Sequence, residues 1–91
     1  MDLKVELIGR AENEISAAQA LKKISDEPEL KVDFGFSADT SFYSNVINHS
    51  YYAIFYSAKA YLVFRGIEVS EQGQHQQVYF KFKKRIPLVL D

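Results

Sequence analysis

Residues 48–66 read NHSYYAIFYSAKAYLVFRG and decide the fold class of this chain. The stretch holds six tyrosine and phenylalanine side chains among alanines, so apolar groups cover almost the whole circumference of a helix. That pattern is typical of a helix packed at the centre of a bundle. A helix is therefore predicted over about residues 40–65, with Asp39 or Thr40 as its N-cap. Gly66 then supplies the left-handed residue that often follows a helix.

Two further segments predict helices that flank the central one. Over about residues 3–25, steps of three and four residues connect an apolar stripe. The stripe consists of Leu7, Ile8, Ala11, Ile15, Ala18 and Leu21. Pro28 disfavours helix at the residue before it and ends this segment. A shorter helix is predicted over about residues 74–85, with Val78 and Phe82 on one side, and Pro87 ends it in the same way.

The segment between the first two helices, residues 29–39, has a different period. Its apolar residues alternate with polar or small ones, at Leu30, Val32, Phe34 and Phe36. That is the period of a strand, but a lone strand has no partner here. An extended loop whose aromatic side chains pack over the bundle is therefore expected, with a short helical turn as the alternative.

The expected fold is a single all-α domain over residues 1–91, an antiparallel up-and-down helical bundle. A chain of three helices that holds 13 phenylalanine and tyrosine residues leaves an apolar face exposed. A partner copy, or C-terminal helices that this chain lacks, would cover that face. On the central helix, Ala53, Ser57 and Ala60 leave room for the close approach of another helix.

Composition excludes several classes of protein and site. The chain has no cysteine, so neither a disulfide nor a thiolate metal site is available. The N-terminal MDLKVELIGR lacks the apolar run of a signal peptide, and no apolar run approaches the roughly 20 residues that span a bilayer. A cytoplasmic protein without membrane contact is expected. Without a His-Glu-x-x-His motif or a close histidine pair, neither a metal ion nor a cofactor is expected.

Charge is distributed unevenly along the chain, although the net charge is −1. Residues 1–39 hold nine acidic and five basic residues, whereas residues 40–91 hold three acidic and six basic ones. The basic excess gathers in Lys81, Lys83, Lys84 and Arg85. These residues form either the solvated end of a helix, where cations are favoured, or an edge that contacts phosphates.

Lys59, Arg65 and His75 are the candidate ligand-binding residues. Lys59 shares a stripe with Tyr52 and Phe55, so its ammonium group must pair, reach the surface along its aliphatic stem, or face a cleft. A cleft that Lys59 shared with Arg65 and His75 would suit a phosphate or nucleotide. Alternatively, His75 hydrogen-bonds back to the central helix, or it transfers protons near neutral pH, which makes it the one catalytic candidate.

Structural roles, rather than ligand binding, are expected for His49 and for the tyrosines. His49, near the start of the central helix, is expected to be a packed or capping residue. The tyrosines have spacings that face a core, so core packing is favoured over base stacking, which requires exposed rings.

One order of residues runs through the central helix and continues into the last one. It reads Asn48-x-x-Tyr51-Tyr52-Ala53-x-Phe55-x-x-Ala58-Lys59-Ala60-x-Leu62-x-x-x-Gly66, then His75, then Phe80 or Phe82. This order resembles the HEPN domain, in particular the small stand-alone HEPN proteins of bacteria and archaea grouped as an uncharacterised family. The charged, alanine-containing residues 11–18 fit the same family. The resemblance covers about residues 3–84, and its Tyr-Tyr-Ala-x-Phe element is the most specific part.

The resemblance implies an antiparallel helical bundle that forms a homodimer. Many members of the family are paired with a small nucleotidyltransferase in toxin–antitoxin systems. Some are metal-independent ribonucleases with an arginine about four to six residues from a histidine. This chain lacks that spacing, because Arg65 and His75 are ten residues apart. It also stops where relatives continue into one or two further helices, so whether it is an enzyme stays open.

The leading expectation is a small HEPN-like helical protein that binds a nucleotide, RNA or a nucleotidyltransferase partner in a toxin–antitoxin-like pair. The first alternative is a metal-independent HEPN ribonuclease in which His75 supplies the acid–base group. The second alternative is a non-catalytic dimerisation module.

Overall fold

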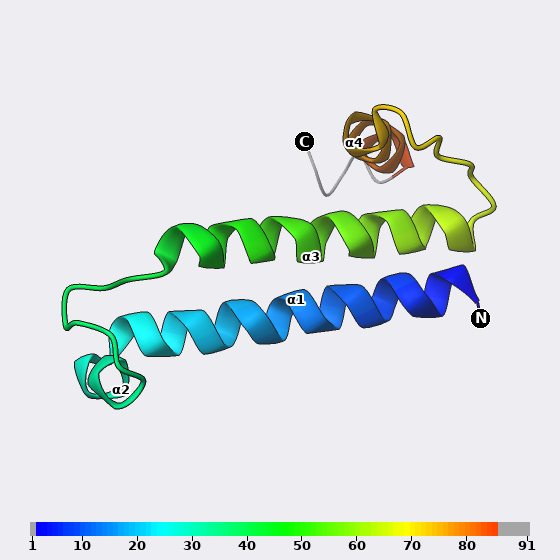
Figure 1. Cartoon of the computed structure of the whole chain (residues 1–91). Helices are drawn as coiled ribbons and strands as arrows, with labels where there is room; N and C mark the ends of the chain where they lie inside the picture. Colours follow the sequence, from blue (N-terminus) through cyan, green and yellow to red (C-terminus); the bar gives the residue numbers. More distant parts are fainter. Residues whose placement is uncertain (1, 86–91) are drawn as a thin grey trace.

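The computed structural model describes residues 2–85, and all regular secondary structure in that range is helical (Figure 1). Four helices follow one another: α1 (Leu3–Asp26), α2 (Pro28–Asp33), α3 (Tyr43–Phe64) and α4 (Gln74–Arg85). The all-α class is thereby confirmed, and α1, α3 and α4 correspond to the three predicted helices. The predicted helix end at Pro87 lies outside the described residues.

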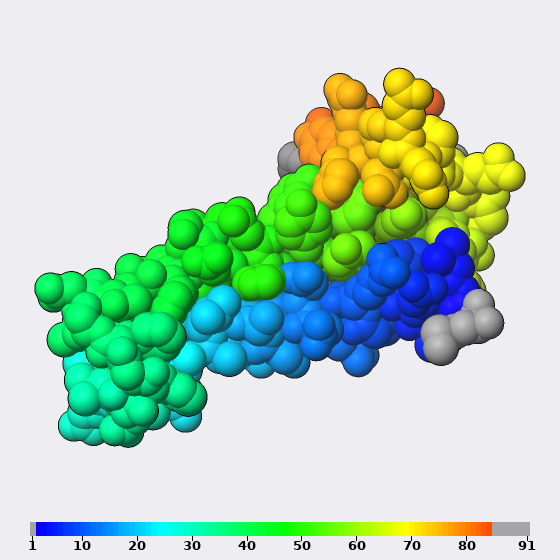
Figure 2. All heavy atoms as spheres, viewed as in Figure 1, coloured from blue at the N-terminus to red at the C-terminus, as the bar shows by residue number. Residues whose placement is uncertain are grey.

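α3 is the middle helix of the arrangement. α1 packs antiparallel along one side of it, and α4 crosses its opposite side (Figure 1). Among the described residues, α4 contacts α3 but not α1. The Cα radius of gyration is 16.4 Å, whereas a compact domain of this length has about 12 Å. The molecule is therefore open and elongated, with α2 at one end and α4 standing out near the other (Figure 2).

Two small cores lie on opposite sides of α3. On the side of α1, buried alanines allow the two helices to approach closely. These are Ala11, Ala18, Ala53 and Ala60. On the side of α4, Phe55, Ala58 and Leu62 form a buried cluster with Val78. Because each core is built from only one pair of helices, part of the surface of α3 stays uncovered.

The segment after α1 begins as a helix, so the extended loop expected over residues 29–39 is wrong for residues 29–33, whereas residues 34–39 form turns and loop. Pro28 begins α2, since its fixed φ suits the first position of a helix. The buried Lys31 then holds the following turn by donating from Nζ to the carbonyl oxygen of Ala38 at 3.1 Å. Val32 and Phe34 do not pack over the bundle, because more than 60% of each is exposed. The short helical turn, the alternative, is the structure that forms.

The start of α3 also differs from the sequence prediction. Its N-cap is Phe42 rather than Asp39 or Thr40, because Thr40 belongs to a separate turn in which its N–H donates to the carbonyl oxygen of Ser37. The N–H of Phe42 instead donates to Oγ of Ser25 at 2.7 Å. A buried serine at the end of α1 therefore positions the beginning of α3.

The end of α3 agrees with the prediction. Gly66 has a φ of +74°, and the N–H of Ile67 donates back to the carbonyl oxygen of Leu62 at 2.9 Å. This is the left-handed glycine stop common at helix C-termini. It turns the chain toward α4. Within residues 2–85, none of the helices has the length and apolarity needed to cross a bilayer.

Candidate functional site

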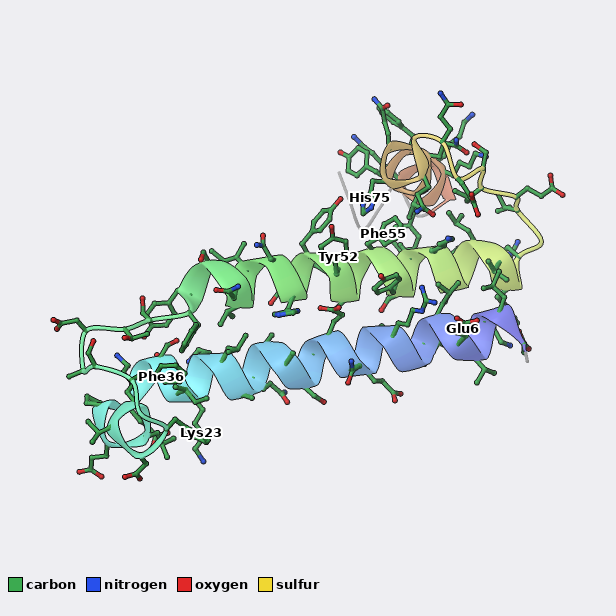
Figure 3. All side chains as sticks on the ribbon, viewed as in Figure 1. Glu6, Lys23, Phe36, Tyr52, Phe55 and His75 are labelled. Carbon is green, nitrogen blue, oxygen red and sulfur yellow. The ribbon has the colours of Figure 1, made fainter. Side chains whose placement is uncertain are left out.

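His75 lies at the junction where α4 rests on α3. Its ring stacks on that of Phe55, with centroids 3.9 Å apart and planes 14° apart. Its Nδ1 lies 2.9 Å from the hydroxyl oxygen of Tyr51. Figure 3 shows Tyr52 and Phe55 projecting from α3 toward this histidine. Of the roles considered for His75, hydrogen bonding back to the central helix is the one that the geometry displays.

Lys59 belongs to the same junction, but Arg65 does not. Nζ of the half-buried Lys59 donates to Oε1 of Gln74 at 2.8 Å, so the lysine pairs with the residue next to His75. Arg65 is the exposed C-cap of α3. It follows Lys59 by six residues, about one and two-thirds turns, and therefore projects from a different face. The structure thus brings together two of the three candidate ligand-binding residues.

The late lysines differ in what they contact. Nζ of Lys81 donates to the carbonyl oxygen of Glu68 at 2.7 Å, so this lysine fastens α4 to the preceding loop. Lys84 is exposed, and Nζ of Lys83 lies 5.9 Å from the ring centroid of Tyr79. The side chain of Arg85 is outside the described residues.

Two aromatic rings stand beside these lysines on the outer face of α4. Tyr79 and Phe80 are 56% and 58% exposed, and their ring centroids are 5.4 Å apart. The expectation that the tyrosines pack in the core is wrong, because none of the six is buried and Tyr43, Tyr51, Tyr52 and Tyr79 are exposed. The apolar side of α4, with Val78 and Phe82, was the available signal, because it leaves Tyr79 and Phe80 to point away from α3.

His49 is a packed residue, as expected. Its Nδ1 lies 2.5 Å from Oε2 of Glu14, and both side chains are mostly buried between α1 and α3. This contact joins the two long helices near the middle of α1. His49 therefore has a structural role in the hairpin that α1 and α3 form.

A hollow of about 670 Å³ lies between α1 and α3, and Phe82 of α4 also lines it. Its lining is formed by Ile15, Ala18, Gln19, Lys22, Val46, Ser50, Ala53, Ile54, Ser57, Ala58, Tyr61 and Phe82. Almost all of these side chains are apolar or small. Phe82 closes one side of the hollow and holds Tyr61 edge-on at a centroid distance of 5.6 Å.

A second hollow of about 350 Å³ continues along the same face toward Lys4 and Phe64. The two hollows share Ile15, Ser57 and Tyr61 as lining residues, and together they are called the α1/α3 groove. Isoleucine and phenylalanine side chains project beside it: Ile54 is 69% exposed and Phe64 65%. Exposed apolar faces of this kind are typical of surfaces that contact other molecules. None of Lys59, Arg65 and His75 lines it.

A polar network closes the end of the groove near α2. Nζ of Lys22 donates to Oδ2 of Asp26 at 2.7 Å, and the hydroxyl of Tyr43 donates to Oδ1 at 2.5 Å. The hydrogen bonds from Lys22 and then Tyr43 lower the pKa of Asp26. The same contacts with Asp26 raise the pKa of Lys22 and the pKa of Tyr43. At neutral pH, the charge of Lys22 is therefore paired within the chain.

The described part of the chain contains no group of three histidine, aspartate or glutamate side chains that would hold a metal ion. No protein-family model, curated protein or solved structure matches the chain. The fold and the site together define a small all-α protein with an open apolar groove and an aromatic, basic outer face on α4.

Proposed function

We propose that this protein is a HEPN-like binding module that holds an amphipathic helix of a partner protein in the α1/α3 groove. The observation that carries the proposal is the hollow of about 670 Å³ between α1 and α3, lined almost wholly by apolar and small side chains. Helix-in-groove recognition uses such a surface, with apolar anchors spaced along one face of the bound helix. The resemblance to HEPN proteins suggests either a second copy or a nucleotidyltransferase as the source of that helix.

The shape of the groove supports a helix as its occupant. Ser50, Ala53 and Ser57 form a floor of small side chains along α3, while Ile15 and Phe82 stand on either side of it. A small floor lets a bound helix approach closely, and the large side chains flanking it provide apolar contact area. The two hollows extend the groove over much of the length of α3.

The test introduces a charge into the floor of the groove. Ser57 is exposed and lines both hollows, so Ser57→Glu places a carboxylate in the binding surface without removing a core side chain. The probe is a fluorescent synthetic helix with leucine at every third and fourth position, followed by anisotropy. We expect Ser57→Glu to weaken binding at least about tenfold, since burying an unpaired carboxylate is costly.

Ser44→Glu is the matched control, because Ser44 is also exposed on α3 but lies outside both hollows. It should bind the probe as tightly as the unmodified chain. Failure of the unmodified chain to bind the helix, or equal binding by both variants, would remove the groove as the site.

A second candidate function, binding of RNA or a nucleotide, is favoured by the outer face of α4. Exposed Tyr79 and Phe80 supply rings on which bases stack, and Lys83 and Lys84 lie beside them. Single-stranded RNA should therefore bind this face, and its affinity should fall as the salt concentration rises. In Lys83→Glu/Lys84→Glu, the slope of the logarithm of the association constant against the logarithm of the salt concentration should be shallower by about 1.4, roughly 0.7 for each lost phosphate contact. Lys4→Glu/Lys23→Glu, with the same charge change on α1, should leave that slope unchanged. Identical slopes for both variants would exclude this face.

A further inference from the structure

We infer that the end of the molecule formed by α2 docks a basic, apolar segment of a partner protein, with an arginine side chain of that segment seated on α2. This surface is called the α2 tip and consists of Pro28, Glu29, Val32, Asp33 and Phe34. The tip lies at the end of the molecule away from α4 (Figure 1), and none of its residues lines the α1/α3 groove. The inference therefore goes beyond the proposed function and does not depend on it.

The usual pattern of burial is reversed along α2. Lys31 is 7% exposed, whereas its neighbour Val32 is 62% exposed, and lysine is ordinarily the more exposed of the two residue types. The ammonium group of Lys31 is turned inward because it holds the following turn through its hydrogen bond to Ala38. Val32 is left in solvent together with Phe34, which is 63% exposed. Covering these two apolar side chains with a partner would be favourable, since it removes apolar area from water.

A hollow on α2 combines this apolar surface with two carboxylates. Its volume is about 320 Å³, and it is lined by Pro28, Glu29, Val32 and Asp33. Glu29 and Asp33 are four residues apart, so their side chains emerge from the same face of the helix. Neither carboxylate forms an ion pair with any other residue that the structure describes. Both are therefore available to a cation from another molecule.

An arginine side chain suits a hollow of this composition. Its aliphatic stem packs against apolar surface, here Pro28 and Val32, while its charged head stays at the edge of the hollow. The planar guanidinium donates two parallel hydrogen bonds to one carboxylate, whereas the ammonium group of a lysine acts as a point charge. Arginine therefore matches both the apolar and the acidic part of the lining.

The charge around the α2 tip determines the chemistry of the rest of the partner segment. Residues 26–39 hold five acidic residues and one basic residue, Lys31, whose side chain is buried. Of the five carboxylates, Asp26 is the one that forms an ion pair within the described part of the chain, with Lys22. Such a surface attracts a basic segment and repels an acidic protein or a nucleic acid. We therefore assign to the tip a segment in which arginines alternate with large apolar residues.

Fluorescence anisotropy with a short peptide of alternating arginine and leucine tests the charged part of the tip. At physiological ionic strength, where general charge attraction is screened, the unmodified chain should bind the peptide. Glu29→Gln/Asp33→Asn should weaken binding at least about tenfold, the effect of one lost charge-assisted hydrogen bond. The matched control is Glu68→Gln/Glu71→Gln, which makes the same change of charge at exposed positions before α4 and should bind normally. A peptide with lysine in place of arginine should bind at least about fivefold more weakly.

Val32→Ser tests the apolar part of the tip. Val32 is exposed, so the variant should keep its helical circular dichroism, while the arginine–leucine peptide should bind about fivefold more weakly because apolar contact is lost. Val5→Ser is the matched control, since Val5 is 55% exposed on α1 and lines neither hollow of the groove. Ser57→Glu, the variant that blocks the groove, should also bind this peptide normally.

The outcomes separate this inference from the proposed function. No binding of the arginine–leucine peptide, equal weakening by the two double variants, or unchanged binding in Val32→Ser would overturn the inference, and equal binding of the lysine peptide would overturn the seat for arginine. Loss of binding in Ser57→Glu would place the peptide in the groove and leave only the proposed function standing. Because α4 is basic, sedimentation velocity tests a second copy as the occupant. An assembly of the unmodified chain that dissociates in Glu29→Gln/Asp33→Asn would overturn the assignment to a partner protein.

Discussion

The imidazole of His75 lies parallel to the ring of Phe55, with their centroids 3.9 Å apart. Phe55 is buried in the core beneath α4, whereas His75 is the second residue of α4 itself. The stack therefore joins the start of α4 to the side of α3 that faces away from α1. α4 has no described contact with α1. It is therefore held in place by the stack of His75 on Phe55 and by the packing of Val78 against α3.

Replacing His75 with alanine should loosen α4 without unfolding the α1–α3 hairpin. The variant loses an aromatic contact and the hydrogen bond with Tyr51, together roughly 1–2 kcal/mol. That corresponds to about tenfold faster amide exchange in α4 through local opening. Hydrogen–deuterium exchange with mass spectrometry measures it. Gln76→Ala, at the exposed next position, should leave the exchange unchanged, and unchanged exchange in His75→Ala would show that the stack does not hold α4.

Local sequence patterns were sufficient for the long helices. The aromatic and alanine run predicted α3, and Gly66 ended it as expected because a glycine stop depends only on the backbone of that residue. The prediction for residues 29–39 was wrong because the alternation of Leu30, Val32 and Phe34 has the period of a strand. Pro28 at the first helical position outweighed that period.

The features that sequence did not predict depend on contacts between distant residues. Phe42 caps α3 because Ser25, 17 positions earlier, accepts its N–H, and no local signal reports such a contact. The exposure of Tyr79 and Phe80 depends on how α4 lies across α3, which composition does not specify. The groove was foreshadowed in part by Ser57, one of the small residues expected to admit another helix.

Ser25→Ala should destabilise the connection between α1 and α3. Ser25 is 4% exposed, and its Oγ accepts the N–H of Phe42 at 2.7 Å. Alanine leaves that N–H without its acceptor, which costs about 1–2 kcal/mol in the free energy of unfolding. Urea titration followed by circular dichroism measures the change. Ser16→Ala, at an exposed position of α1, should change the free energy by less than about 0.5 kcal/mol. Equal effects of the two substitutions would contradict the role of Ser25.

The network of Lys22, Asp26 and Tyr43 should stabilise the fold between about pH 4 and about pH 10. The pKa of Asp26 is lowered by its hydrogen bonds from Lys22 and Tyr43. The contribution of Asp26 to the free energy of unfolding is therefore present above the pKa of this carboxyl in the unfolded chain, about 3.9. It is lost as the pH falls through the lower pKa of Asp26 in the folded protein. The pKa values of Lys22 and Tyr43 are raised by Asp26, so their contribution is present below about pH 10 and is lost as pH rises further.

Asp26→Asn tests the acid limb of that dependence. The variant should be less stable than the unmodified chain at pH 6, and the difference should shrink at pH 2, where the carboxylate is protonated in both states. Tyr43→Phe removes one of the two hydrogen bonds to Asp26 and should show a smaller difference of the same sign. Urea titrations at the two pH values provide the measurement. A difference of equal size at both would mean that the ionised carboxylate is not the stabilising group.

Gly66→Ala and Gly9→Ala should change stability in opposite directions, although the chemical change is the same. Gly66 has a φ of +74°, which alanine adopts at a cost of about 1–2 kcal/mol. Gly9 lies within α1, has no positive φ, and no atom lies within 4 Å of an added Cβ. Alanine there should stabilise the protein by about 0.5–1 kcal/mol, because glycine loses more conformational entropy in a helix. Thermal unfolding midpoints measure both, and a shift of the same sign in the two variants would contradict the assigned backbone conformations.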